Sequence, residues 1–503
     1  MQEKKKKIYK IFYSIREKLY KICETQARKK EMSEKVKRQI KLKKPASAGI
    51  LYTAISLMER GSSVIFAPIY TRLLLPGEYG IYSLFVSFMG IVSVFATLEI
   101  SGTAIYRALK EFGEKEKVCT AAIGLISLCS ILTLGIYLVF SPIVNAYSKL
   151  STYLTLILFL QVYLSGVKAI KTSSAKFSYD KRFPFLEGIF FSFLTPAISI
   201  LFLILFNRNE YAKIYATLLS TAVFTLPILF NLLKGGVGRL FDKKIWLFLA
   251  KYSLPILPHF LSMSLIWQIG KFTVANSFSA ADTALLSLAI SVGLIPSVIG
   301  SGIQSAMIPW ITRRLTEGKF GREKIYSLLI SSVYPLCLFT VLFVAVCPEL
   351  FAILSAKAYL NAIGAIYPIA TSVPLVFLSA IFSSEISHYK KTYLVTAGSV
   401  LGMLFNVICN LLFTPKLSFM FSAFLIAPTF LIINIVYVSI LRVKFKDSEL
   451  PLRKLITVFS VFLFLVFIAF SLRISLSARI FFSIALVMMI LPKLRDIKEL
   501  CRE

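Results

Sequence analysis

Long apolar stretches run through this sequence of 503 residues, and they restrict its fold more than any other feature. The hydrocarbon core of a bilayer is about 30 Å thick, so a spanning helix needs about 20 mostly apolar residues. Stretches that meet this requirement lie at 48–73, 79–101, 118–141, 151–167, 183–207, 211–233, 246–272, 282–309, 325–346, 361–384, 393–413, 418–440, 455–472 and 477–493. A membrane β-barrel would instead alternate apolar and polar residues in segments of about ten. The sequence therefore predicts an all-α polytopic membrane protein with about 14 transmembrane helices.

Positive charge alternates from loop to loop along the chain. The formal net charge is +32, and 17 of the 57 Lys and Arg residues lie in the first 45 positions. Alternate loops carry 26 Lys and Arg in one set and 9 in the other, and the sparse set includes Lys213. Because cytoplasmic loops are enriched in Lys and Arg, we expect a multi-pass protein of the cytoplasmic (inner) membrane, with both termini cytoplasmic and Lys213 in an outer loop. The basic charge then follows from topology, and no nucleic acid is expected as a partner.

A basic N-terminal segment, 1–45, precedes the first apolar stretch. Apolar side chains recur in it at helical spacing between lysines: Ile8, Ile11, Phe12, Ile15, Leu19 and Ile22. This pattern predicts either an amphipathic helix on anionic membrane lipids or a solvated tail that only fixes orientation. The segment has no early apolar core, so a cleavable signal peptide is not expected. The seven cysteines show no metal-ligand spacing, so neither a metal nor another cofactor is expected.

The two halves of the chain show weak internal similarity. A shift of 204 residues aligns 75–101 with the second-half stretch that ends at 305, with seven identities. The same shift pairs the first predicted span with the seventh, so the halves are parallel repeats of six spans. We therefore expect two six-helix bundles around a central cavity. The predicted boundaries are 46–233 for the first bundle, 234–245 for a cytoplasmic linker, 246–440 for the second bundle, and 441–503 for two extra helices and a basic tail.

Prolines interrupt the leading helix of each predicted bundle. Pro68 lies in the first span, and Pro255 and Pro258 lie in the seventh. An interior proline removes a hydrogen bond and kinks a helix. We interpret these three prolines as a gate or hinge, although membrane helices also tolerate proline without a special role.

The stretch 67–112 reads APIYTRLLLPGEYGIYSLFVSFMGIVSVFATLEISGTAIYRALKEF. Thr-Arg-Leu-Leu follows Pro68, then comes Pro-x-Glu-Tyr-Gly-x-Tyr from Pro76, and Arg107 ends the second span. This pattern resembles the Wzx-like polysaccharide and O-antigen repeat-unit flippases of the multidrug/oligosaccharidyl-lipid/polysaccharide (MOP) exporter superfamily. The resemblance covers about 46–490. The family often carries an acid before the cation near the end of span 7, where this chain has Gly270 before Lys271.

The resemblance implies a flippase that moves undecaprenyl-diphosphate-linked oligosaccharide repeat units across the cytoplasmic membrane. The translocated units would be used to make O-antigen, capsule or exopolysaccharide, and a polysaccharide polymerase would be a partner. A multidrug or metabolite antiporter of the same superfamily and a peptidoglycan-precursor lipid flippase are the alternatives. The sequence lacks a Gly-rich phosphate loop and a paired-His metal spacing, and its outer loops are short. These features argue against an enzyme such as a glycan polymerase.

Two adjacent charges, Glu59 and Arg60, lie near the middle of the first span. A charge there costs roughly 2.5–3.5 kcal/mol on insertion scales, so a function should offset that cost. A guanidinium binds phosphate oxygens bidentately, so Arg60 is the first candidate for the pyrophosphate. Glu59 is a candidate for a coupling ion or an ion pair. A static polar network that holds both charges is the alternative.

Further candidates lie in and near the seventh span. Lys271 either faces the cavity as a second cation for the substrate or snorkels to the outer interface. Gln268, a turn earlier, binds sugar hydroxyls or holds helices together. Arg107 contacts the incoming pyrophosphate or only obeys the topology rule. His259 is a candidate for proton coupling or a hydrogen-bonded core residue, and Glu187 is expected at the membrane interface.

Overall fold

The computed structural model describes residues 45–102, 104–206, 209–234, 240–315, 319–389, 391–445, 447, 449–472, 477–484 and 488. All regular elements in these residues are helical, which confirms the all-α fold. The first-half helices are α2 (Pro45–Leu73), α3 (Pro76–Thr97), α4 (Ala104–Phe112), α5 (Lys115–Ser148), α6 (Thr152–Phe177), α7 (Arg182–Ile189), α8 (Thr195–Leu205) and α9 (Glu210–Leu233). The predicted amphipathic segment before Pro45 lies outside the described residues.

The remaining helices follow in chain order. They are α10 (Lys243–Ser253), α11 (Leu257–Ser277), α12 (Ala280–Gly293), α13 (Ser297–Arg314), α14 (Lys319–Leu354), α15 (Ile363–His388), α16 (Thr392–Phe413), α17 (Phe419–Phe424), α18 (Ile426–Ser439) and α19 (Leu452–Ser471). Short 3-10 or π-helical turns join some of them, at Phe190–Leu194, Leu254–Ile256, Lys357–Ala362, Thr414–Lys416 and Ile440–Lys444. A last helical segment spans 477–484.

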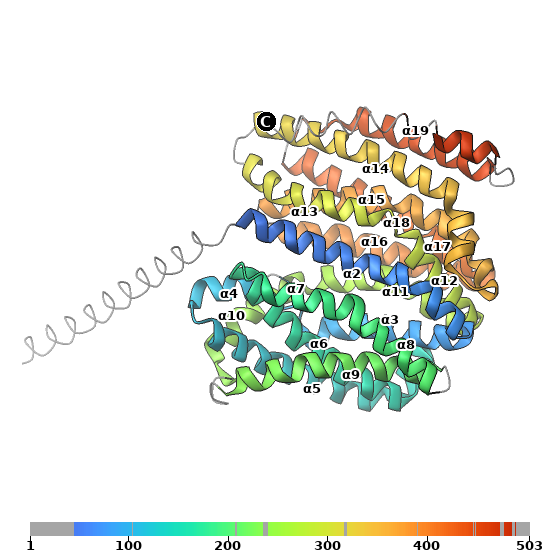
Figure 1. The fold of residues 1–503 in the computed structure, drawn as a ribbon. Helices are drawn as coiled ribbons and strands as arrows, with labels where there is room; N and C mark the ends of the chain where they lie inside the picture. Colours follow the sequence, from blue (N-terminus) through green and yellow to red (C-terminus); the bar gives the residue numbers. More distant parts are fainter. Residues whose placement is uncertain are drawn as a thin grey trace, which may run out of the picture.

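The helices form two groups, with α2 running between them (Figure 1). The blue and green helices α3–α9 lie below α2 in this view, and the yellow and orange helices α13–α18 lie above it, with α19 at the upper edge. Helix α3 packs against α12, and α11 packs against both α3 and α16, so these helices join the two groups. This arrangement places the interface between the halves along α2, α3, α11 and α12.

The two ends of the bundle differ in their loops. We call the end that holds α4, α10 and residues 178–181 the basic end, because the Lys- and Arg-rich loops meet there. It lies at the left of Figure 1. The other end, called the opposite end, holds the short turns at 73–76, 148–152 and 277–280.

In the described residues, fewer helices qualify as membrane spans than the fourteen that we expected. Among the described residues, ten helices are long and apolar enough to cross a membrane, or eleven if α12 and α13 count as one bent span. Helices α2 and α11 fall outside this count. Both carry interior polar residues, including Glu59 and Lys271, which lower their apolar character. The chain is therefore a multi-pass helical membrane protein, and the total of fourteen spans is not confirmed.

The helix predicted at 282–309 is broken in the structure. Helix α12 ends at Gly293, α13 begins at Ser297, and the two axes differ by 49°. Pro296 lies in the break, where it has no N–H to continue the helical ladder. The apolar pattern continues through this break, which explains why the sequence indicated one continuous span.

Helix α10 packs against the first-half helices, on α4 and α5. The indole N–H of Trp246 donates a hydrogen bond to the Ala121 carbonyl at 2.8 Å, and Ile245 and Leu249 are buried in a cluster with residues of α4 and α5. The turn Leu254–Ile256 then leads into α11. Pro255 lies in this turn and Pro258 in the first turn of α11, whereas Pro68 lies inside α2. The hinge role of these prolines stays a prediction.

The two halves close on each other at the opposite end. A Cβ on Gly80 of α3 would lie 1.8 Å from the carbonyl oxygen of Ala280, the first residue of α12. The Tyr359 hydroxyl donates to the Leu74 carbonyl at 3.0 Å, and a guanidinium nitrogen of Arg72 donates to the Ile353 carbonyl at 3.2 Å. All three contacts join residues of the first half to residues of the second. They hold the two halves in contact at this end of the interface.

Candidate functional site

A cavity in two parts lies at the interface of the two halves. The first chamber, of about 390 Å³, is bounded mainly by α2, α3, α8 and α9. The second chamber, of about 500 Å³, is bounded mainly by α11, α12 and the break before α13. Lys271 and Ser291 line both chambers, so the chambers adjoin at these two residues. The predicted central cavity is therefore the natural place for a candidate site.

Lys271 and Gln268 stand together on α11, as their spacing indicates. The Lys271 ammonium donates to the Gln268 side-chain oxygen at 3.1 Å, and only 9% of Lys271 is exposed. Because Lys271 faces both chambers, the reading in which it snorkels to the interface does not describe this conformation. Within the described residues, no carboxylate lies within ion-pair distance of its ammonium. The pair thus offers one cation and one amide to the cavity.

Lys213 is a second buried cation in the first chamber, and the sequence reasoning missed it. Its side chain is 4% exposed, and its ammonium lies 3.7 Å from the ring centre of Tyr70, 3.9 Å from that of Tyr82 and 4.8 Å from that of Tyr79. Cation–π contacts of this kind contribute roughly 0.5–2 kcal/mol each. In the described part of the chain no carboxylate pairs with this ammonium. Lys213 is therefore a cation held by aromatic rings and open to a cavity.

The local sequence explains where α9 begins but not the environment of Lys213. The Asn209 side chain accepts a hydrogen bond from the Ala212 N–H and caps α9, so the helix begins at Glu210. Lys213 then lies one turn inside, near the positive end of the helix dipole, where a cation is disfavoured. Its tyrosine neighbours come from α2 and α3, far away in sequence. The sequence signal for Lys213 is its position just after the start of the predicted span 211–233. That position also fits a residue of an outer loop.

Two hydroxyl groups in the first chamber have no hydrogen-bond partner among the described residues. The Ser83 Oγ and Thr195 Oγ1 atoms are buried and make no hydrogen bond within the described residues. Both residues line the chamber that also holds Lys213. A buried hydroxyl without a partner costs roughly 1–3 kcal/mol, so a bound polar group would relieve that cost. These two atoms extend the polar surface around the lysine.

Glu59 and Arg60 both lie in α2, and of their two side chains the structure describes that of Glu59. Glu59 is exposed and lines the first chamber, together with Lys213 and Lys271. It is the only acid among the described residues of the two chambers. The Arg60 side chain lies outside the described residues, so its place in the substrate site stays a prediction. The described lining thus has two cations and one acid.

His259 and Arg107 do not line either chamber. Nδ1 of His259 lies 3.0 Å from the Ser399 Oγ atom, which joins α11 to α16 within the second half. The Arg107 guanidinium lies over the ring of Tyr252 at 4.6 Å, where α4 meets α10 at the basic end. The histidine is in the hydrogen-bonded position that we gave as its alternative, and the arginine is exposed at the basic end.

Glu187, which we expected at the membrane interface, is buried among side chains of the first half. It is 7% exposed, and one of its carboxylate oxygens lies 3.4 Å from the Lys168 ammonium. The Thr172 hydroxyl donates to its other oxygen at 2.7 Å. Lys168 also lies 3.7 Å above the ring of Phe191, which lines the first chamber. This satisfied acid–lysine pair supports the wall of the chamber and leaves no charge of its own for a ligand.

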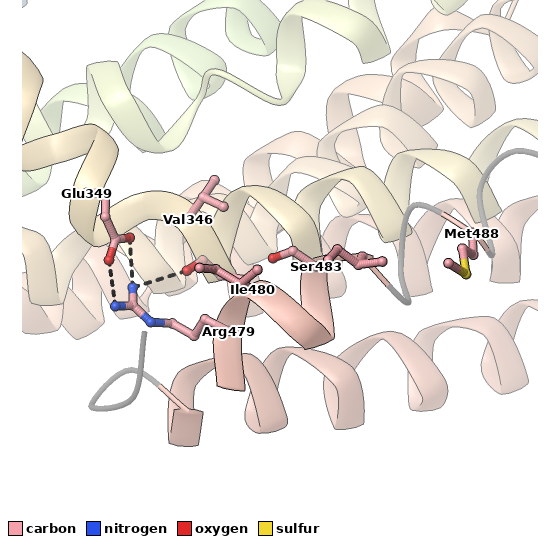
Figure 2. A pocket seen from close by; sticks show the side chains of 8 residues that line it. Val346, Glu349, Arg479, Ile480, Ser483 and Met488 are labelled. Atoms are coloured by element: carbon pink, nitrogen blue, oxygen red, sulfur yellow. Dashed lines mark hydrogen bonds and ion pairs between the residues drawn. The ribbon is translucent and has the colours of Figure 1, made fainter. Parts of the chain in front are cut away.

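A third pocket, of about 500 Å³, lies between α14 and the last helical segment (Figure 2). The Arg479 guanidinium binds both carboxylate oxygens of Glu349, at 2.5 and 2.8 Å. Apolar side chains such as Val346, Ile480 and Met488 line the rest of the pocket. Because the two opposite charges are paired with each other, this pocket has no unpaired charge for a charged substrate, although Nε of Arg479 makes no hydrogen bond within the described residues.

The chain matches known proteins at two levels. A family model described as "Polysaccharide biosynthesis protein" matches residues 47–315, more than half of the chain. No curated protein sequence matches the chain significantly. The family match confirms the resemblance drawn from the stretch 67–112.

Solved structures share the fold at low sequence identity. One is "Lipid II flippase MurJ, inward closed conformation", with a TM-score of 0.67 at 14% identity, covering 89% of this chain and 99% of that one. Another is the "Inward-facing conformation of a multidrug resistance MATE family transporter of the MOP superfamily", with a TM-score of 0.63 at 15% identity, covering 80% and 99%.

A third solved structure is described as "Reverse polarity of binding pocket suggests different function of a MOP superfamily transporter from Pyrococcus furiosus Vc1 (DSM3638)". It has a TM-score of 0.54 at 16% identity, covering 78% of this chain and 94% of that one. With the family match, these structures identify the chain as a member of the polysaccharide biosynthesis protein family with the fold of MOP superfamily transporters.

Proposed function

We propose that this protein is a flippase that translocates undecaprenyl-diphosphate-linked oligosaccharide repeat units for the synthesis of O-antigen, capsule or exopolysaccharide. The observation that carries the proposal is the pair of buried lysines, Lys213 and Lys271, which face one cavity between the halves. A buried ammonium without a carboxylate is costly, so an anionic ligand explains both. A lipid diphosphate supplies such an anion.

Each candidate residue has a role in this proposal. Lys271 binds the diphosphate together with Arg60, whose guanidinium suits paired phosphate oxygens. Gln268 and the unpartnered hydroxyls of Ser83 and Thr195 hydrogen-bond the sugar. Arg107 contacts the diphosphate as it arrives at the basic end, which we place in the cytoplasm. The lipid tail stays in the bilayer, and the cavity carries only the polar head.

The remaining predictions concern coupling and surroundings. Glu59 is the candidate for a coupling ion because it alone among the described lining residues is acidic. His259 is a second candidate, although its contact with Ser399 ties it to helix packing. Pro68, Pro255 and Pro258 form the proposed hinge. A polysaccharide polymerase in the same cytoplasmic membrane is the proposed partner, and anionic lipids contact the N-terminal segment.

A multidrug or metabolite antiporter is the competing function, because transporters of that kind share the fold. An antiporter for cationic compounds needs acids in its cavity to balance the charge of the substrate. The described lining has more lysines than acids, which favours an anionic substrate. A flippase for a peptidoglycan precursor uses the same diphosphate chemistry, so only the sugar distinguishes it.

The test uses cells in which the gene is deleted and then complemented. The variants are Lys271→Gln and Arg60→Gln, and the matched control is Lys357→Gln, an exposed lysine at the opposite end. Losing a hydrogen bond to a charged group costs roughly 1.5–3 kcal/mol, or about 10- to 150-fold in binding. We expect the deletion strain to accumulate undecaprenyl-linked oligosaccharide and to lack surface polysaccharide. Complementation with the control variant should return both quantities to their wild-type levels.

The outcomes separate the proposals. Failure of Lys271→Gln to rescue, at equal protein level in the membrane, supports both the flippase and the site. Full rescue by both variants would leave the flippase function in place and would show that Lys271 and Arg60 do not form its substrate site. Normal polysaccharide in the deletion strain, together with altered drug sensitivity, would favour the antiporter. Accumulation of a peptidoglycan precursor would identify the other flippase.

A further inference from the structure

An ion pair occurs at the same place in both halves of the protein. Lys117 lies 3.3 Å from Asp242 in the first half, and Arg322 lies 3.8 Å from Asp447 in the second. A shift of 205 residues, one more than the shift of 204 that aligns 75–101 with the second half, maps the first pair onto the second. In each half the pair joins the start of one long helix, α5 or α14, to the segment that follows the last helix of that half.

The second copy contains two additional titratable groups. The Tyr326 hydroxyl oxygen lies 2.9 Å from Oε1 of Glu385 and 2.5 Å from Oδ2 of Asp447. Tyr326 is 3% exposed, Glu385 0% and Asp447 2%, whereas the Asp242 side chain is 20% exposed. The positions that the shift pairs with Tyr326 and Glu385 are Ala121 and Asp180. The first half therefore has a simple ion pair where the second half has a buried cluster.

The hydrogen count in this cluster is one short if both carboxyl groups are ionised. A phenol has one hydrogen, so Tyr326 can donate to only one of its two carboxylate neighbours. The 2.5 Å contact has the length of an O–H···O⁻ bond to a charged acceptor, which assigns that hydrogen to Asp447. The 2.9 Å contact to Glu385 then needs a hydrogen from the carboxyl group itself. In addition, Oε2 of Glu385 is buried and makes no hydrogen bond.

The charge count leads to the same conclusion. Among the described residues, the groups that face Glu385 and Asp447 are Arg322 and Tyr326 from α14 and Tyr389 from the end of α15. Of these groups only Arg322 is positively charged, and one of its nitrogens donates to the Tyr389 hydroxyl at 3.0 Å. Two buried carboxylates that share one partner cannot both ionise without a large cost. One proton held in the cluster removes that imbalance.

We propose that Glu385, Tyr326 and Asp447 form a binding site for a single proton, which fastens the segment after α18 to α14 and α15. In the occupied site, Glu385 is a neutral acid that donates to the Tyr326 oxygen, and Tyr326 donates to the Asp447 carboxylate. The carboxylate is also paired with Arg322. These residues line neither chamber of the cavity, so the site is separate from the proposed substrate site.

The segment after α18, to which Phe445, Asp447 and Glu449 belong and which we call the fastened segment, has contacts that depend on Asp447. The Asp447 N–H donates to the Leu441 carbonyl at 3.1 Å, and Oδ1 of Asp447 accepts from the Glu449 N–H at 3.1 Å. Phe445 stacks on Tyr389 with ring centres 4.0 Å apart. When the proton leaves, the two acids repel each other and Asp447 separates from Tyr326. The stacked ring and both backbone contacts then come under strain together.

The direction of the pH dependence follows from linkage. The fastened segment binds a proton that the detached, exposed carboxyl group would release. Fastening is therefore strongest at acidic pH and weakens as the pH rises. The change is about tenfold per pH unit across the range in which only the fastened form holds the proton. In the first half, the described partners of Asp242 are the Lys117 ammonium and the N–H groups of Lys244 and Ile245, and no acid is among them, so no shared proton is required there.

The first measurement is infrared titration of the purified protein in lipid vesicles. We expect the wild type to show a carboxylic acid C=O band that disappears as the pH rises. Glu385→Gln and Asp447→Asn should both lack this band, because neither variant needs the shared proton. Asp242→Asn, the matched change in the first half, should retain it. A band unchanged in both cluster variants would overturn the proposal, and either variant alone suffices if the other fails to reach the membrane.

The second measurement is hydrogen exchange of the amides at 441–450 in the same samples. The protection factor of these amides should fall with pH in the wild type and in Asp242→Asn. It should not depend on pH in Glu385→Gln, which mimics the neutral acid. The same pH profile in the wild type and in Glu385→Gln would refute the link between the proton and the segment. Neither readout requires a transported substrate, so the result does not depend on the proposed flippase activity.

Discussion

Gly80 allows a direct test of how the opposite end closes. It lies in α3 and faces Ala280, and a methyl group at this position would stand 1.8 Å from the Ala280 carbonyl oxygen and 2.6 Å from its carbonyl carbon. The shorter distance is about 1.6 Å below the 3.4 Å at which ordinary contact begins. The obstructing atoms belong to the backbone, so no rotation of a side chain can relieve the clash. Gly80→Ala therefore requires α3 and α12 to separate.

The energetic consequence can be estimated from overpacking in general. Extra methyl groups in well-packed sites cost roughly 1–3 kcal/mol. A change of that size shifts a two-state equilibrium by about 5- to 150-fold. We therefore expect Gly80→Ala to lower the population of the closed form and to favour a form open at the opposite end. Gly77→Ala is the matched control, because it lies in the same helix and its Cβ would meet nothing within 4 Å.

Accessibility of the cavity provides the assay. A cysteine at Ser291, which lines both chambers, is introduced into a variant without the native cysteines. A membrane-impermeant maleimide is then added to vesicles of each orientation. We expect Gly80→Ala to increase labelling from the opposite end by a factor within the range above, and Gly77→Ala to leave it unchanged. Equal labelling in both variants, with equal amounts of folded protein, would refute the reasoning.

The other predictions concern single contacts. Lys213→Met should abolish transport yet leave the thermal unfolding temperature equal or higher, because replacing a buried unpaired charge by an apolar side chain is often neutral or stabilising; a large loss of stability would instead make Lys213 structural. Tyr359→Phe removes a hydrogen bond of roughly 0.5–1.5 kcal/mol and should increase opposite-end labelling less than Gly80→Ala does. Desolvation raises the pKa of Asp242, but the Ile245 N–H, the Lys117 ammonium and the Lys244 N–H together hold that pKa below its ordinary value. The stability that Asp242 provides should therefore be present above the ordinary pKa of an aspartate and be lost as the pH falls through the lowered value, and thermal melts of Asp242→Asn should lack this acid-sensitive part.

Much of the fold was predictable because membrane helices leave a strong signal in sequence. The apolar lengths and the alternating charge gave an all-α multi-pass protein, and the motif around Glu78 and Tyr79 led to the right family. The break between α12 and α13 was not predictable in the same way. Its residues are as apolar as the helices they join, and a single proline does not distinguish a kink from a break.

The candidate site was predictable only in part. Lys271 and Gln268 lie on one helix, so their spacing was enough to bring them together. Lys213 was missed because its environment comes from three tyrosines on two other helices. The cluster of Tyr326, Glu385 and Asp447 was missed for the same reason, since its members are 59 and 62 residues apart along the chain. Local patterns do not record such distant neighbours.

The repeated ion pair has a consequence for the extent of the internal similarity. Lys117–Asp242 and Arg322–Asp447 match under one shift, so the similarity between the halves reaches the segments that follow α9 and α18. After α9 that segment leads into α10 and the second half, whereas after α18 it leads to α19. The same ion pair therefore stands at the passage between the halves in one case and at the exit from the second half in the other.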